Sequence, residues 1–157
     1  MRAILFDIDG TLSNCDHRLH YVQNGNRDWS SFFREMDKDT PNESIAWLAR
    51  NIGSLMTDIA VLIVTARPDD ADYRMKTQLW LREHNIPYRG FYMRRAGDYR
   101  KDSIVKAEIL QQILDDGYEP FLVVDDRQQV VDMWRSHGIM TLQCAPEEKL
   151  VSKYEGQ

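Results

Sequence analysis

Residues 4–12 read ILFDIDGTL, an apolar run that ends in two aspartates with one residue between them. The run predicts a buried strand, and because side chains alternate along a strand, Asp7 and Asp9 should point the same way. Two like charges side by side repel each other, and burying them is costly unless a cation lies between them. This strand end is therefore either frayed and solvated, or built to hold a metal ion and act on a phosphate.

The size and composition of the chain indicate one ordinary globular domain over residues 1–157. The 157 residues are 43% hydrophobic and 29% charged, enough to build a substantial core. No apolar run approaches the roughly 18–20 residues that span a membrane, and no signal-peptide pattern is present. Cys15 and Cys144 match neither a metal spacing nor a disulfide framework, so we expect a reduced, cytoplasmic protein.

Charge is distributed unevenly along the chain. The net charge of −5 gives no general reason to expect a nucleic-acid binder. Residues 89–106, however, hold six basic and two acidic residues, a net charge of +4, which leaves −9 for the remainder. This stretch is either a solvated face or a phosphate-facing patch, and its position in the fold decides between the two.

Alternating apolar runs and amphipathic segments predict the fold class. Near-continuous apolar runs are typical of parallel strands that are covered on both faces, and amphipathic patterns between them predict helices. This alternation predicts an α/β fold with a doubly wound, mainly parallel five-stranded sheet and right-handed crossovers. The predicted strands are residues 2–8, 58–66, 88–94, 120–126 and 139–145, and the predicted helices are residues 40–56, 68–84, 101–116 and 127–137.

Two details complete the predicted organisation. The first helix is expected to begin with a capping box, with Thr40 as N-cap, Pro41 at the first position and Glu43 at the third. Residues 13–38 do not fit the strand–helix alternation, and we expect them to form a small flap over the strand ends. The aromatic residues of this flap either form a small apolar core beneath it or stack on a nucleobase; they are Trp29, Phe32 and Phe33.

Polar residues follow the predicted strands where those strands end. Asp7-Ile8-Asp9 follows the first, Thr65-Ala66-Arg67 the second and Asp125-Asp126-Arg127 the fourth, while the third runs into the basic stretch. Any one of these groups could be a turn or a helix cap. Because ligands of open α/β sheets bind at the carboxyl ends of the strands, their convergence on one edge predicts a site.

The residue types at this edge indicate phosphoryl chemistry. Carboxylates without histidine or cysteine partners are hard oxygen ligands that suit Mg²⁺. An aspartate can attack a phosphoryl group, and a second carboxyl can protonate the leaving oxygen and then activate water. A hydroxyl from Thr65 and an ammonium from a helix, for which we favour Lys106, would bind the phosphoryl oxygens.

These residues resemble, in order, the four motifs of the haloacid dehalogenase (HAD) superfamily. Within that superfamily the chain is similar to the phosphatase half of phage polynucleotide kinase-phosphatases over about residues 3–146. The strings that carry this resemblance, besides DIDGTL, are RMKTQLW, RRAGDYRKDSIVKAEI and VVDDRQQVVDMWR.

The resemblance implies a role for each matching residue. Asp7 would be the nucleophile and a Mg²⁺ ligand, and Asp9 the acid/base, which also binds the metal through its backbone carbonyl. Thr65 and Lys106 would hold the phosphoryl group, with Lys101 as the rival lysine. The remaining metal ligands would be Asp125 and Asp126, and the substrate-binding residues would be Arg18, Arg67, Arg94, Arg100, Asp102 and Arg127.

The expected function is a Mg²⁺-dependent phosphomonoesterase that acts through an aspartyl-phosphate and removes 3′-phosphates from DNA or RNA ends. The first alternative is a nucleotidase or other small-molecule phosphatase, and a remote one is a catalytically silent binding module. The chain contains no GxxxxGK[ST], so we expect a phosphatase that stands alone. The partners to consider are phosphorylated nucleic-acid ends or nucleotides, a separate kinase or ligase, and a second copy of the chain.

Overall fold

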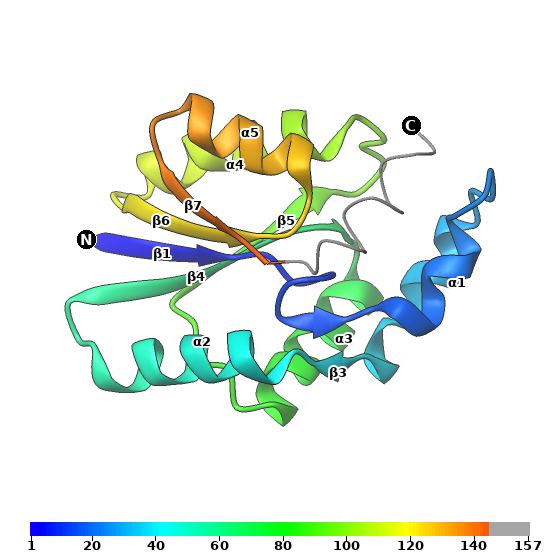
Figure 1. The fold of residues 1–157 in the computed structure, drawn as a ribbon, viewed down its shortest axis with the longest axis horizontal. Helices are drawn as coiled ribbons and strands as arrows, with labels where there is room; N and C mark the ends of the chain where they lie inside the picture. The colour runs from blue at the N-terminus through cyan, green and yellow to red at the C-terminus, as the bar shows by residue number, and fades with distance from the viewer. Residues whose placement is uncertain (145–157) are drawn as a thin grey trace.

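The computed structural model describes residues 1–144, which form a five-stranded sheet with helices on both faces (Figure 1). The strand order is β5-β4-β1-β6-β7, and every neighbouring pair is parallel. The predicted α/β fold class is therefore confirmed. The strands of this sheet are β1 Arg2–Phe6, β4 Ile59–Asp69, β5 Gly90–Arg95, β6 Glu119–Asp125 and β7 Met140–Gln143.

Helices flank the sheet on both of its faces (Figure 1). They are α2 Glu43–Leu55 and α3 Ala71–Glu83 on one face, and α4 Asp102–Asp115 and α5 Gln128–Ser136 on the other. All four fall within the predicted helical segments. Residue 145, the last of the predicted strand 139–145, lies outside the described residues.

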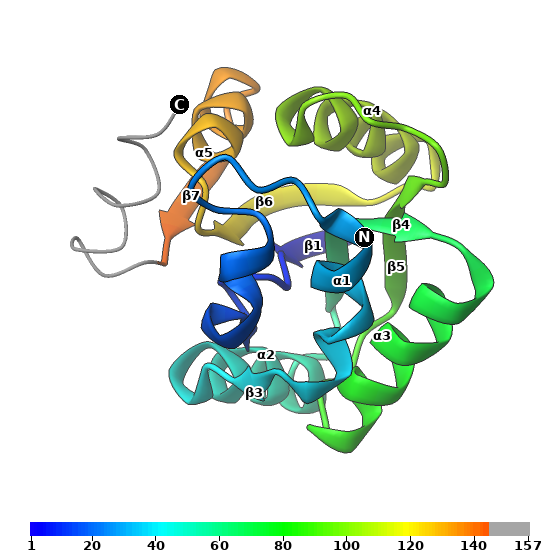
Figure 2. The same ribbon diagram turned by 90° about the vertical axis from the view of Figure 1, so that its right-hand side faces the viewer.

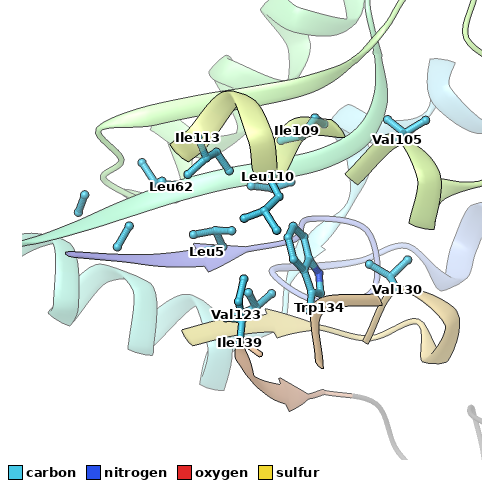
Figure 3. Packing of buried hydrophobic residues seen from close by; sticks show 13 residues of the cluster. Leu5, Leu62, Val105, Ile109, Leu110, Ile113, Val123, Val130, Trp134 and Ile139 are labelled. Carbon is cyan, nitrogen blue, oxygen red and sulfur yellow. The ribbon is translucent and has the colours of Figure 1, made fainter. Parts of the chain in front are cut away.

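Each face of the sheet buries its own apolar core. The core under α4 and α5 contains Leu5, Leu62, Ile113 and Trp134, whose side chains interlock between the sheet and the helices (Figure 3). The opposite core forms under α2 and α3 around Phe6 and other side chains of β1 and β4. Because both faces are covered, the central strands are apolar at almost every position, as the sequence pattern indicates.

The segment between β1 and α2 forms a flap at the carboxyl end of the sheet (Figure 2). Its two ends pair with each other as a short antiparallel ladder, Ser13 with Pro41 and Asn14 with Thr40. These two ends are β2 and β3, and the other elements of the flap lie between them, so the flap has five elements in all. These are β2 Ser13–Asn14, η1 Asp16–Tyr21, α1 Trp29–Arg34, η2 Met36–Lys38 and β3 Thr40–Pro41.

The predicted capping box at the start of α2 is wrong. Thr40 and Pro41 are in β3, and the helix begins at Glu43 with Asn42 as its N-cap. The side-chain amide of Asn42 donates to the carbonyl oxygens of Thr11 (2.8 Å) and Ser13 (3.2 Å). Pairing with a segment far away in the sequence therefore decides this boundary, and a local residue pattern does not detect it.

Candidate active site

One part of the site is a buried cluster of three aspartates and a lysine. One carboxylate oxygen each of Asp7, Asp125 and Asp126 lies within 4.8 Å of the others. The Nζ atom of Lys106 lies 2.7 Å from Asp7 Oδ1 and 2.7 Å from Asp125 Oδ2. Asp7 follows β1, Asp125 ends β6 and Lys106 lies in α4, so three separate elements meet here. The structure thus brings together residues that the sequence assigned to one edge.

Burial and neighbouring charges set the protonation of this cluster. Burial would lower the pKa of Lys106, but Asp125 and Asp7 outweigh it and hold the pKa above its ordinary value, so the ammonium is charged. Burial raises the pKa of Asp7 well above its ordinary value, Lys106 offsets part of this effect, and the other carboxylates add to it. The cluster thus contains three carboxyl groups and the ammonium of Lys106.

The donor set of this cluster fits Mg²⁺. All three donors are carboxylate oxygens, all three residues are buried, and neither histidine nor cysteine is among them. Hard oxygen donors in this arrangement suit a hard divalent cation. Such an ion would also add positive charge next to the buried carboxyl group of Asp7 and so favour its ionised form.

Asp9 lies next to this cluster and accepts hydrogen bonds from two arginines. Arg67 donates from Nε to Asp9 Oδ2 at 3.0 Å and from a terminal nitrogen to Oδ1 at 2.7 Å, and Arg18 also donates to Oδ1. Both arginine side chains are fully buried. Burial alone would raise the pKa of Asp9, but Arg67 and Arg18 hold it well below its usual range. Asp9 is therefore ionised and fixed in orientation.

A second carboxylate, that of Asp39, accepts hydrogen bonds from the same two arginines. Arg18 donates from Nε to Asp39 Oδ1 at 2.7 Å, and Arg67 donates to Asp39 Oδ2 at 3.4 Å. Ser13 donates its hydroxyl to Asp39 at 2.9 Å, and His17 Nε2 lies 2.9 Å from Asp39 Oδ1. Sequence reasoning missed Asp39, because an aspartate in the polar stretch MDKDT carries no periodic signal.

The sharp turn after β1 aims Asp7 and Asp9 into the site. Gly10 has φ +88°, a left-handed backbone conformation that an L side chain rarely adopts. The N–H of Gly10 donates to Ser13 at 2.9 Å, and the N–H of Ser13 donates to Ile8 at 2.9 Å. The DIDGTL sequence therefore folds back on itself and joins the strand directly to the flap.

A bulge at the end of β4 turns Arg67 toward Asp9. The pairing with β5 runs from Thr65 opposite Met93 to Pro68 opposite Arg94, so Ala66 and Arg67 have no partner on β5. Arg94 donates from Nε to the carbonyl oxygen of Ala66 at 2.8 Å, which holds the bulge. Thr65 is fully buried, and its Oγ1 accepts the N–H of Arg67 at 3.2 Å. The strand also runs to Asp69, three residues beyond the predicted end.

The other predicted substrate residues form a chain of ion pairs beside the cluster. Asp102, the first residue of α4, accepts hydrogen bonds from Arg94 and from Arg127. Arg127 directly follows Asp126. Arg100 lies farther out, where it binds Asp98 and Glu108.

The structure distinguishes the two candidate lysines by position. Lys106 is buried between Asp7 and Asp125, whereas Lys101 is an exposed residue that precedes α4 as its N-cap. The basic stretch 89–106 is thus part buried site and part exposed surface.

Aromatic residues of the flap also divide between the core and the surface. Phe32 is buried, and its ring lies 4.1 Å from the guanidinium carbon of Arg18. Phe33 packs against Tyr73 of α3 at 5.7 Å between ring centroids, and Trp29 stacks on Phe33 at 6.0 Å while remaining 47% exposed. Phe32 therefore belongs to the small apolar core expected beneath the flap, whereas Trp29 faces solvent.

No helix among residues 1–144 combines the length and the apolar character that crossing a membrane requires.

Known proteins resemble this chain in sequence and in fold. Residues 1–148 match the family described as the polynucleotide kinase PNKP phosphatase domain. A chain in the structure of the Pnkp1/Rnl/Hen1 RNA repair complex is 30% identical, with a TM-score of 0.73, and the match covers 91% of this chain and 42% of that one. A second structure of the Pnkp1/Rnl/Hen1 complex matches at 28% identity and a TM-score of 0.72, covering 91% of this chain and 45% of that one.

The chain therefore spans less than half the length of those two chains. A haloacid dehalogenase-like hydrolase from Streptococcus pneumoniae matches at 15% identity and a TM-score of 0.66, covering 97% of this chain and 90% of that one. At this identity the likeness shows a shared fold alone.

Proposed function

The chain belongs to the family of PNKP phosphatase domains, and from this premise we propose that it is a Mg²⁺-dependent phosphomonoesterase that removes 3′-phosphates from DNA or RNA ends. The observation that carries this proposal is the position of Lys106 Nζ, 2.7 Å from both Asp7 and Asp125 inside the acidic cluster. A buried nucleophile candidate, a fixed cation and three metal-type ligands in one place are the groups that phosphoryl transfer needs.

In the first step, an Asp7 oxygen attacks phosphorus and the bond from phosphorus to the 3′-oxygen breaks. Asp9 is ionised in the free protein, and in the bound complex it first takes the proton of the phosphate monoester monoanion. The leaving oxygen then takes this proton from Asp9, and the phosphoryl group remains on Asp7 as an aspartyl-phosphate. In the second step, water attacks phosphorus, Asp9 accepts the proton, and inorganic phosphate leaves while Asp7 is regenerated. The ionised form of Asp9 described above is the base form that this second step uses.

The other residues hold the reacting groups in place. Thr65 and Lys106 would bind the equatorial phosphoryl oxygens, and Arg18 and Arg67 fix Asp9 where the leaving oxygen departs. Asp7, Asp125, Asp126 and the backbone carbonyl of Asp9 would hold Mg²⁺. The ion would neutralise the attacking carboxylate of Asp7 and the phosphate, so that these two anions can approach each other.

We also propose that the substrate is a nucleic-acid strand and that separate enzymes act beside this one. The support comes from two similar chains solved in Pnkp1/Rnl/Hen1 complexes, one of which is described as an RNA repair complex. The substrate-binding roles of Arg94, Arg100, Asp102 and Arg127 belong to this proposal. Self-association of the chain stays a prediction, which light scattering during size-exclusion chromatography tests.

Phosphate release in the presence of Mg²⁺ tests the proposed function. The substrates are one oligonucleotide with a 3′-phosphate, the same oligonucleotide with a 5′-phosphate, and a series of 3′- and 5′-mononucleotides. We expect preference for the 3′-phosphorylated strand, loss of activity in EDTA and in Asp7→Asn, and normal activity in Asp58→Asn, an exposed aspartate before β4. Equal or faster turnover of mononucleotides would instead assign the chain as a nucleotidase.

A further inference from the structure

The loop between β5 and α4, residues 96–101, is braced by an arginine beneath it. Arg94 is nearly buried, and its Nη1 donates to the carbonyl oxygens of Asp98 at 3.0 Å and Arg100 at 2.7 Å. The carboxylate of Asp98 accepts the N–H of Arg100 at 3.0 Å, and Gly97 adopts a left-handed φ of +79°. Hydrogen bonds on both sides of residue 99 therefore fix the shape of the loop.

This fixed loop displays an aromatic ring to water. Tyr99 is 95% exposed, although its neighbours Asp98 and Arg100 are both held. An exposed aromatic ring contributes no hydrophobic stabilisation to the fold, because it stays in contact with water. A ring held out by a rigid segment is, however, a ready surface for stacking, since little conformational freedom remains to be lost on binding.

Two cations beside Tyr99 are available to a ligand. Arg100 binds Asp98 at 2.7 Å and Glu108 at 2.7 Å, so a strand phosphate has to compete with these carboxylates for it. Arg95 and Lys101 are exposed, and neither forms an ion pair with a carboxylate of residues 1–144. Along the chain, the exposed ring of Tyr99 thus lies between two exposed positive charges.

The loop lies at the same end of the sheet as the candidate active site (Figure 2). Lys101 precedes Asp102, which binds Arg127 beside the acidic cluster. Lys106 is four residues farther along α4, a rise of about 6 Å. The three residues from Tyr99 to Asp102 span at most about 11 Å. Tyr99 is therefore within the reach of a few nucleotides from a phosphate bound at Lys106.

We propose that Tyr99 stacks on a nucleobase of a single strand, while Arg95 and Lys101 contact the phosphates on either side. The base would lie a few nucleotides to the 5′ side of the reacting 3′-phosphate. Stacking on an aromatic ring accepts any base, so the site would select single-stranded ends by length rather than by sequence. This inference rests on the proposed function and narrows its substrate to a strand longer than one nucleotide.

Length-dependent kinetics and direct binding test the inference. Tyr99→Ala, Tyr99→Trp and the wild type would be compared on 3′-phosphorylated oligothymidylates of one to ten nucleotides, with Trp47→Ala as the control. Trp47 is also an exposed aromatic residue, but it lies on α2, on the opposite face of the sheet from α4. Binding of a fluorescein-labelled ten-nucleotide strand, followed by anisotropy, gives a readout that does not depend on catalysis.

The expected result is a selective loss. Tyr99→Ala should weaken binding and raise KM for the ten-nucleotide substrate by about 5- to 150-fold, the range for one aromatic stack, and leave the mononucleotide unaffected. Tyr99→Trp should restore both values, and Trp47→Ala should match the wild type. Arg95→Gln with Lys101→Gln should reduce the slope of log Kd against log salt by about 1.4, at about 0.7 for each phosphate contact with a single strand.

The outcomes separate this inference from the proposed function. If the wild type prefers the long strand and Tyr99→Ala behaves like it in both assays, the Tyr99 site is refuted while the polynucleotide function stands. If the wild type handles the mononucleotide as well as the ten-nucleotide strand and does not bind the labelled strand, both are refuted.

Discussion

Replacing Asp39 by asparagine tests whether one buried charge holds the arginines that fix Asp9. Arg18 and Arg67 are both fully buried, and Asp9 and Asp39 are the two carboxylates bound to them. Asp39→Asn keeps the size of the side chain but removes its charge, so two buried guanidiniums share one carboxylate. Breaking a buried ion pair on one side costs about 3–5 kcal/mol.

This cost is a large share of a typical domain stability of about 5–15 kcal/mol. With a urea dependence of about 2 kcal/mol per molar, the midpoint of unfolding should fall by about 1.5–2.5 M. In the folded variant, Asp9 should lose its fixed orientation, and kcat should fall about 10²-fold, at the lower end of what general acid–base catalysis contributes.

Urea unfolding followed by circular dichroism, and phosphate release without urea, measure the two effects. Asp37→Asn is the matched control, because it is the same substitution two residues away at an exposed position and should change stability by less than about 0.5 kcal/mol. If Asp39→Asn unfolded within 1 kcal/mol of the wild type and kept its kcat, the charge of Asp39 would not be what holds Arg18 and Arg67.

Three further predictions concern other parts of the structure. Partial burial, opposed by a contact with Thr11 and aided by the nearby carboxylates, raises the pKa of the Cys144 thiol to about 12. Iodoacetamide at pH 8 should therefore alkylate Cys144 over 100-fold more slowly than free cysteine, and mass spectrometry showing a comparable rate would contradict the raised pKa. Gly10→Ala forces a side chain into a left-handed conformation and should lower thermal stability by about 1–2 kcal/mol, whereas an unchanged melting temperature would mean that the turn tolerates a Cβ. Leu62→Ala leaves a cavity in the core and should lower the free energy of unfolding in urea by about 2–5 kcal/mol. Leu55 is 74% exposed, so Leu55→Ala should lower it far less, and equal losses would disprove the assignment of this core.

Much of the fold could be predicted from the sequence because the parallel sheet leaves a strong pattern. β1, β4 and β6 each contain an unbroken apolar run, and the helices α2 and α5 are clearly amphipathic. The meeting of Asp7 and Asp125 at one edge could also be predicted, since the carboxyl ends of parallel strands share an edge.

The remaining features depend on contacts that no local pattern carries. Thr40 and Pro41 look like the start of a helix, but they pair with Ser13 and Asn14 instead. The bulge after Thr65 is held by the Arg94 side chain from the next strand. Each of these features depends on a partner distant in the sequence, so only the folded chain reveals it.

Asp39 is the clearest case of a site residue that the sequence did not indicate. Its partners, Arg18 and Arg67, lie 21 and 28 residues away, and only the folded chain brings the three side chains together. Trp134 also makes a contact at the site that the sequence did not indicate. Its position in α5 predicts a core residue, and its side chain is fully buried in the core. Its indole N–H also donates to Asp125 at 3.3 Å.

The most direct test of the account is to trap the covalent intermediate on Asp7. The wild type and Asp7→Asn would be mixed with Mg²⁺ and an oligonucleotide carrying a ³²P-labelled 3′-phosphate, quenched in acid within milliseconds, and digested for peptide mapping. The account predicts hydroxylamine-sensitive label on the peptide that contains Asp7 in the wild type, with neither label nor phosphate release in Asp7→Asn. Label on another residue, or phosphate release by Asp7→Asn near the wild-type rate, would contradict it.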